Sequence, residues 1–288
     1  MEELTLPTLR ERFPLPSHDG DSSKDERGRV LVVGGHRTVP GGALLAATGA
    51  LRAGAGKLQV NTVDSIAVPL GVAIPEGLVA GVGESEDGGF PATAGEKVAE
   101  RIGKVDAALV GSGMLDGEGT DAIVRAALGT QTPLVLDAAA ITALKAMEAE
   151  AKARGRLALL PHAGELAGLR GCEEDEVGGD PVGVGQDAAR RCNAVTLVKG
   201  SESHICGPQG EVFHYRGGGV GLATSGSGDT LAGIVAGLAA RGLDLLPAVL
   251  WGVWLHGEAG RRLASQVGRV GFLAREILDE IPRLLNDA

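Results

Sequence analysis

Short apolar runs alternate with helix-patterned stretches along most of this 288-residue chain. The apolar runs predicted to form buried strands are residues 29–33, 57–62, 107–110, 134–136, 157–160 and 195–198. Helical spacing of apolar residues occurs between them at 43–53, 95–102, 120–128, 138–149 and, more weakly, 187–192. This alternation predicts an α/β fold, in which crossover helices cover both faces of a mostly parallel sheet.

The composition limits both the core and the partners. Only 2% of the residues are aromatic, so we expect an aliphatic core. The chain is long enough for one large domain, predicted at residues 28–288 behind an N-terminal segment at 1–27. A net charge of -10 without a long basic run argues against nucleic-acid or membrane partners.

The cysteines and the chain ends predict a cytoplasmic protein. The three cysteines, Cys172, Cys192 and Cys206, lack metal-ligand spacing, and their odd number favours a reducing compartment. Neither a signal peptide nor a membrane span is expected. The apolar stretch 248–255 fits either the core or the interface of a homo-oligomer, and the adjacent His256 is interpreted as a packing residue.

Three further segments depart from the strand and helix alternation. Residues 203–206 and 212–215 alternate around a glycine-containing turn, which predicts an antiparallel hairpin at one edge of the sheet. We expect this hairpin to cover one side of a nucleotide site. The acidic, glycine-rich stretches 84–89 and 173–180 are predicted to be solvated loops.

Polar and glycine residues gather where the predicted strands end. They are Gly34, Gly35, Gly111, Ser112, Gly113, Asp137, His162, Lys199 and Gly200. Any one of these residues is compatible with an ordinary turn. Because parallel strands end at one edge of a sheet, the whole set predicts the rim of a ligand pocket.

The loop 224–230 adds a candidate anion site. The backbone N–H groups of Gly226, Ser227 and Gly228 precede an apolar helix, whose positive dipole end favours a phosphate. Asp229 would repel a phosphate, so we interpret it as the base that takes a proton from an attacking hydroxyl. The alternative is that Asp229 only caps the helix.

A series of short motifs extends from residue 28 almost to the C-terminus. They are GRVLVVGG at 28–35, GGALLAA at 41–47, LRAGAG at 51–56, GSG at 111–113, LDA at 136–138, PHAGE at 161–165, VKG at 198–200, ATSGSGD at 223–229, LHG at 255–257 and GFLAREI at 271–277. In this order they resemble the ADP/ATP-dependent NAD(P)H-hydrate dehydratases. The resemblance implies a ribokinase-like three-layer αβα fold. The epimerase domain that is fused to some family members is not expected here.

The resemblance also implies a repair reaction. Family members phosphorylate the ring hydroxyl of hydrated NADH or NADPH with ADP or ATP, and loss of phosphate restores the cofactor. The implied substrate residues are Gly42, Gly113, His162 and Asp229, with Asp229 catalytic. The implied nucleotide residues are Lys199, Gly200, Ser201, Glu202, Ser203 and Gly228. Glu165 resembles the acidic residue that assists Mg²⁺, and a separate epimerase is an expected partner.

Simpler alternatives stand beside these roles. His162 could only cap the following helix, Lys199 could be a solvated lysine, and Glu165 could be an exposed first-turn acid. Leu160, Ala163 and residues 217–221 depart from the family pattern, so substrate contacts and loop order stay open. A ribokinase-like kinase for a vitamin-precursor alcohol and a non-catalytic nucleotide sensor are the rival functions. The sequence distinguishes neither ADP from ATP nor the NADH hydrate from the NADPH hydrate.

Overall fold

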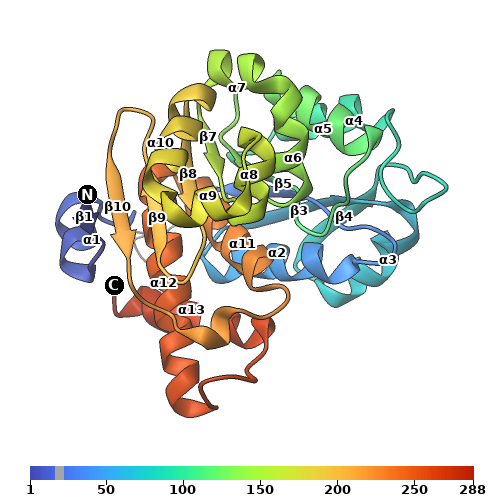
Figure 1. Cartoon of the computed structure of the whole chain (residues 1–288). Coiled ribbons are helices and arrows are strands. Elements are labelled where there is room, and N and C mark those ends of the chain that lie inside the picture. The colour runs from blue at the N-terminus through green and yellow to red at the C-terminus, as the bar shows by residue number, and fades with distance from the viewer. Residues whose placement is uncertain (17–22) are drawn as a thin grey trace.

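A computed structural model describes residues 1–16 and 23–288 and contains one ten-stranded sheet with helices on both faces (Figure 1). The strands follow the order β1-β10-β9-β8-β7-β6-β5-β2-β3-β4. Their bounds are β1 Glu2–Glu3, β2 Arg29–Val33, β3 Lys57–Thr62, β4 Gly77–Gly81, β5 Ala107–Val110, β6 Leu134–Leu136, β7 Leu157–Leu159, β8 Ala194–Val198, β9 Ser203–Cys206 and β10 Val212–Tyr215. All neighbours from β8 to β4 are parallel, whereas β9 is antiparallel to both β8 and β10. The predicted α/β class and the edge hairpin are confirmed.

The helices form the two outer layers. Their bounds are α1 Leu6–Arg12, α2 Pro40–Arg52, α3 Asp64–Ala73, α4 Ala94–Ile102, α5 Glu118–Leu128, α6 Ala139–Leu144, α7 Glu148–Arg154, α8 Ala163–Arg170, α9 Glu174–Gly179, α10 Pro181–Cys192, α11 Ser227–Ala240, α12 Leu245–Gln266 and α13 Ala274–Asn286. One apolar cluster joins a face of the sheet to α2, α11, α12 and α13, and a second joins the opposite face to α4, α5, α6, α8 and α10.

Strand β2 shows why the strand sequences are continuous apolar runs. Val30 and Val32 belong to the first cluster, while Leu31 and Val33 belong to the second, and all four side chains are fully buried. A strand that is covered on both faces needs apolar residues at every position.

Close packing of α11 against α2 fixes the position of the loop that leads into α11. A Cβ atom on Gly233 would stand 2.1 Å from the carbonyl oxygen of Ala46, so only glycine permits this approach. The small glycine and alanine residues of the two helices allow this close approach, and it brings the start of α11 next to the start of α2.

Several elements differ from the prediction. Helix α3 and strand β4 were not expected, and residues 138–149 form α6, a short 3-10 helix and the start of α7. The prediction of a loop at 173–180 was wrong. Glu173 and Glu176 form reciprocal capping contacts, and the buried Val177 anchors α9.

The tryptophans settle the location of the apolar stretch 248–255. Trp251 is 1% exposed and Trp254 is 8% exposed, so both side chains belong to the core. No helix within residues 1–16 and 23–288 is both long enough and apolar enough to cross a bilayer. The three cysteines are all free thiols.

Candidate active site

The Asp229 carboxylate lies in the first turn of α11, beside the start of α2. Gly226, at φ 87°, precedes the helix in the left-handed conformation. A Cβ atom on Gly42 would stand 3.1 Å from Asp229 Oδ1 and 2.6 Å from the Cα atom of Gly113. A side chain at position 42 would therefore collide with the backbone of Gly113 and crowd the carboxylate of Asp229. Three predicted substrate residues, Gly42, Gly113 and Asp229, thus lie together.

The surroundings of Asp229 make it a stronger base than an exposed aspartate. Burial raises the pKa of Asp229 to about 6, and the negative charge of Asp137 acts in the same direction. The Ser112 hydroxyl, the Lys199 ammonium and the N–H of Gly113 favour the ionised form and limit the rise. At neutral pH the carboxylate is ionised and still close to its pKa, as general-base catalysis requires.

Lys199 follows β8 and contacts two carboxylates. Its Nζ atom lies 2.8 Å from Asp137 Oδ1 and 3.9 Å from Glu165 Oε2. Burial disfavours the ammonium, but the charges of Asp137 and Glu165 outweigh it, so the pKa of Lys199 is raised. Its side chain is only 20% exposed and points toward Gly228, so the alternative of a solvated lysine was wrong.

His162 and Glu165 cap α8 reciprocally. The N–H of Glu165 donates to His162 Nδ1 at 3.2 Å, and the N–H of His162 donates to Glu165 Oε2 at 2.8 Å. The capping role considered for His162 is confirmed, and His162 also lines the cavity described below. Glu165 is 16% exposed and lies near Lys199, so it is not the exposed first-turn acid of the alternative.

A cavity of about 820 Å³ opens between the ends of β7 and β8, the hairpin β9–β10 and the start of α11. This volume lies within the range of small-molecule sites. The predicted site residues that line it are His162, Lys199, Gly200, Ser201, Ser203, Ser227 and Gly228. Leu222, Leu231 and Val253 form an apolar wall, and the hairpin contributes Ser203 and Tyr215.

One predicted nucleotide residue does not line the cavity. Glu202 Oε1 lies 3.2 Å from Arg216 Nε, and this ion pair joins the ends of the two hairpin strands. The side chain of Glu202 therefore ties the hairpin together at its base.

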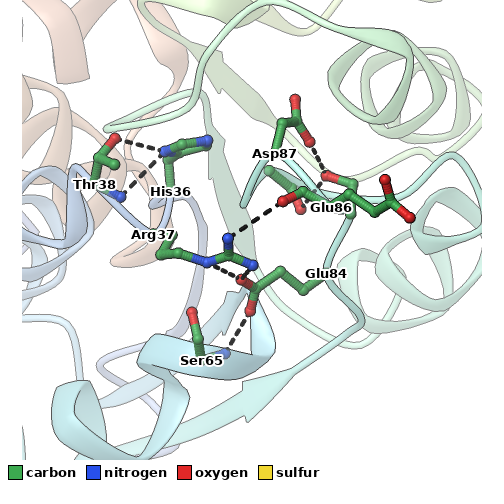
Figure 2. Close-up of polar contacts among 9 residues, drawn as sticks. His36, Arg37, Thr38, Ser65, Glu84, Glu86 and Asp87 are labelled. Atoms are coloured by element: carbon green, nitrogen blue, oxygen red, sulfur yellow. Dashed lines mark hydrogen bonds and ion pairs between the residues drawn. The ribbon is translucent and has the colours of Figure 1, made fainter.

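Arg37 joins two loops, one that follows β2 and one that follows β4 (Figure 2). Arg37 Nε donates to Glu84 Oε1 at 2.6 Å, and the backbone N–H of Arg37 donates to the carbonyl oxygen of Gly88 at 2.9 Å. Glu84 Oε2 accepts from the N–H of Ser65 at 2.7 Å, at the start of α3. The stretch 84–89 is a loop, as predicted, and it is solvated in part, because Glu86 and Asp87 are exposed whereas the side chain of Glu84 is only 11% exposed.

The sequence reasoning missed one polar contact in the cavity wall. His256 is 9% exposed in α12, and its Nε2 atom lies 3.0 Å from Ser227 Oγ. Burial lowers the pKa of His256 to about 4. A histidine inside an apolar helix was the available signal, but the sequence does not reveal that α12 crosses the start of α11.

Comparisons with known proteins identify the family that this chain is similar to. A family model described as NAD(P)H-hydrate dehydratase matches residues 30–283. An ADP-dependent (S)-NAD(P)H-hydrate dehydratase of Xanthomonas campestris is 45% identical over 285 residues, which cover 98% of this chain and 96% of the relative.

Two solved structures extend the comparison. An ADP/ATP-dependent NAD(P)H-hydrate dehydratase from Bacillus subtilis, co-crystallized with ATP/Mg²⁺, has a TM-score of 0.84 at 28% identity and covers 99% of this chain and 98% of its own. A ribokinase-like superfamily protein from Enterococcus faecalis has a TM-score of 0.84 at 25% identity and covers 100% and 96%. The fold and the cavity thus define a ribokinase-like protein. Within that class, the chain belongs to the NAD(P)H-hydrate dehydratase family.

Proposed function

We propose that this protein removes water from hydrated NADH or NADPH with ADP as the phosphoryl donor, and so restores the reduced cofactor. One observation carries the proposal. Asp229 lies beside the backbone of Gly42 and Gly113, and it directly follows Gly228, which lines the cavity together with Lys199. A base between a nucleotide and a hydroxyl compound is the arrangement that phosphoryl transfer requires.

The proposed reaction has two chemical steps. The ring hydroxyl of the hydrate attacks the β-phosphorus of ADP, Asp229 accepts the hydroxyl proton, and AMP departs. The carbon–oxygen bond of the resulting ester then breaks, inorganic phosphate leaves, and loss of a proton from the adjacent ring carbon restores the double bond. The sum is ADP plus hydrate giving AMP, phosphate and NAD(P)H. Phosphorylation turns hydroxide, a poor leaving group, into a good one.

One part of the cavity is suited to the phosphates of a nucleotide and another part to its base. Lys199 supplies a cation, and the N–H groups of Gly228 and Asp229 have no acceptor among residues 1–16 and 23–288. Such N–H groups at a helix start favour a phosphate. The apolar wall of Leu222, Leu231 and Val253 suits a base. We therefore assign this cavity to ADP and the space at Gly42 and Gly113 to the hydrate.

The charge balance of the site fits Mg²⁺ as a companion of the nucleotide. One ammonium, that of Lys199, faces the carboxylates of Asp137, Glu165 and Asp229. No group of three potential ligands within the described residues is arranged to hold a metal by itself. Mg²⁺ often binds through one or two carboxylates plus phosphate oxygens and waters, and Glu165 is the carboxylate we assign to it. When bound, the ion would neutralise phosphate charge.

The test supplies hydrated NADH together with ADP, and in parallel with ATP, and follows both the nucleotide product and the restored NADH. We expect AMP and NADH in equal amounts from ADP. Phosphorylation of a vitamin-precursor alcohol without NADH formation would instead support a kinase. ADP binding without turnover would support a nucleotide sensor, and either result would overturn the proposal.

Three accompanying predictions concern the cellular setting. We propose a cytoplasmic location, because the chain contains three free thiols and lacks a membrane-spanning helix in its described part. Assembly into a homo-oligomer and action beside a separate epimerase are further proposals. Size measurement in solution and co-purification from cells test them.

A further inference from the structure

We propose that His256 is a positioning residue of the nucleotide cavity, which orients the Ser227 hydroxyl so that this hydroxyl donates to a phosphate oxygen of the bound nucleotide. This inference rests on the proposed function. It concerns a contact between two helices, α11 and α12, that meet at the cavity wall.

The prediction that the backbone N–H of Ser227 binds an anion was wrong, because this N–H is already engaged, and the hydroxyl is the donor that Ser227 can offer. That N–H donates to the carbonyl oxygen of Thr224 at 3.2 Å. The hydroxyl oxygen lies 3.0 Å from His256 Nε2, and both residues line the cavity. A serine hydroxyl rotates freely unless a neighbour fixes it. His256 is that neighbour.

The direction of the contact depends on the tautomer of His256. Its pKa of about 4, lowered by burial, leaves the imidazole neutral at physiological pH. A neutral imidazole has one donor and one acceptor nitrogen. If Nε2 carries the proton, it donates to Ser227 Oγ, and the serine proton is free to point toward a phosphate. The proposed orientation of the Ser227 hydroxyl therefore requires the Nε2–H tautomer of His256.

Packing alone gives no reason for a histidine at this position. The preceding residues of α12, Trp254 and Leu255, are buried and apolar, and a leucine would fill the space without burying a polar ring. The polar ring gains its hydrogen bond where α12 meets the start of α11.

The test measures ADP affinity by calorimetry and turnover with hydrated NADH in His256→Leu, His256→Gln, Ser227→Ala and the double variant His256→Leu/Ser227→Ala. We expect about a tenfold loss of ADP affinity in His256→Leu and in Ser227→Ala, as for one hydrogen bond. The double variant should lose no more than either single variant. His256→Gln, whose amide nitrogen can replace Nε2–H, should stay within about threefold of the wild type.

His204→Leu is the matched control, because His204 is a half-buried histidine that does not line the cavity, and ADP affinity should not change. Nitrogen NMR of the wild type should show the proton of His256 on Nε2. Wild-type ADP affinity in His256→Leu, additive losses in the double variant, or a proton on Nδ1 would each overturn the inference. If His256→Leu does not fold, the ADP affinities of Ser227→Ala and His256→Gln and the tautomer seen by NMR still test the inference. Failure of the wild type to bind ADP would refute the proposed function itself.

Discussion

Lys199 donates a 2.8 Å hydrogen bond to Asp137, although 62 positions separate the two residues in the sequence. Asp137 follows β6 and Lys199 follows β8, so the sheet places both residues at one edge. The pair matters because Asp137 also raises the pKa of Asp229, while Lys199 opposes the rise. The lysine that we assign to the nucleotide and the carboxylate that we assign to proton transfer are thus electrostatically linked.

Asp229→Asn should retain ADP affinity and lose at least about a hundredfold in turnover. The amide keeps the shape of the side chain but cannot accept the proton of the attacking hydroxyl. Steady-state turnover and calorimetric ADP binding are the measurements. The exposed Asp121 of α5 provides the control, since Asp121→Asn should change neither quantity. Near-normal turnover in the pure Asp229→Asn protein would refute the assignment of the base.

The same substitution should stabilise the fold at neutral pH. The pKa of Asp229 is raised from 3.8 in the unfolded chain to about 6. The folded state therefore prefers the protonated acid, and its stability falls as pH rises from about 4 through 6. At pH 7 the ionised carboxylate costs up to about 3 kcal/mol, which asparagine avoids. Denaturant unfolding should show this gain at pH 7 and little gain at pH 4. Equal stability of the two proteins at pH 7 would contradict the raised pKa.

Lys199→Ala should weaken ADP more than the hydrate, by about 1 to 3 kcal/mol, because a charged hydrogen bond to phosphate is lost. Removing the lysine also leaves Asp137 without its ion-pair partner. The double variant Lys199→Ala/Asp137→Asn separates this effect on stability from the effect on binding. Calorimetry with each ligand is the measurement. Equal weakening of both ligands would argue against separate sites.

The glycine-rich approach to α11 should become ordered when nucleotide binds. Residues 217, 219, 220 and 224 line the cavity, so a nucleotide would contact this segment directly. Gly221 already packs tightly, since a Cβ atom there would stand 2.3 Å from Phe272 Cε1. We expect amide hydrogen exchange across 217–229 to slow with ADP and Mg²⁺. Equal exchange with and without ligands would mean that the loop is preformed.

The buried strands could be predicted because their apolar runs are continuous. Residues 107–110, for example, are all apolar and all buried in β5. Strand β4 was missed because it lies at the sheet edge, is only partly buried and contains Gly77 and Gly81. Helix α3 was missed because Pro69 lies inside it and its apolar residues follow no clear stripe.

In the candidate site, too, some features could be predicted from the sequence and others could not. Asp229 and Lys199 could be predicted from motifs, since each stands in a local pattern of glycines or follows a strand. The contacts of Asp137 with Lys199 and of His256 with Ser227 could not, because they join elements far apart in the sequence. Local patterns place a residue on an element, but only the packing of the layers decides which elements meet.

The central claim is that the hydroxyl of the hydrate is phosphorylated before it leaves, and an oxygen label tests this most directly. Hydrated NADH that carries heavy oxygen (¹⁸O) in its ring hydroxyl is converted with ADP, and the products are analysed by mass spectrometry. Because the proposed ester breaks between carbon and oxygen, we predict that the label appears in inorganic phosphate. Label found in water, with unlabelled phosphate, would contradict the account.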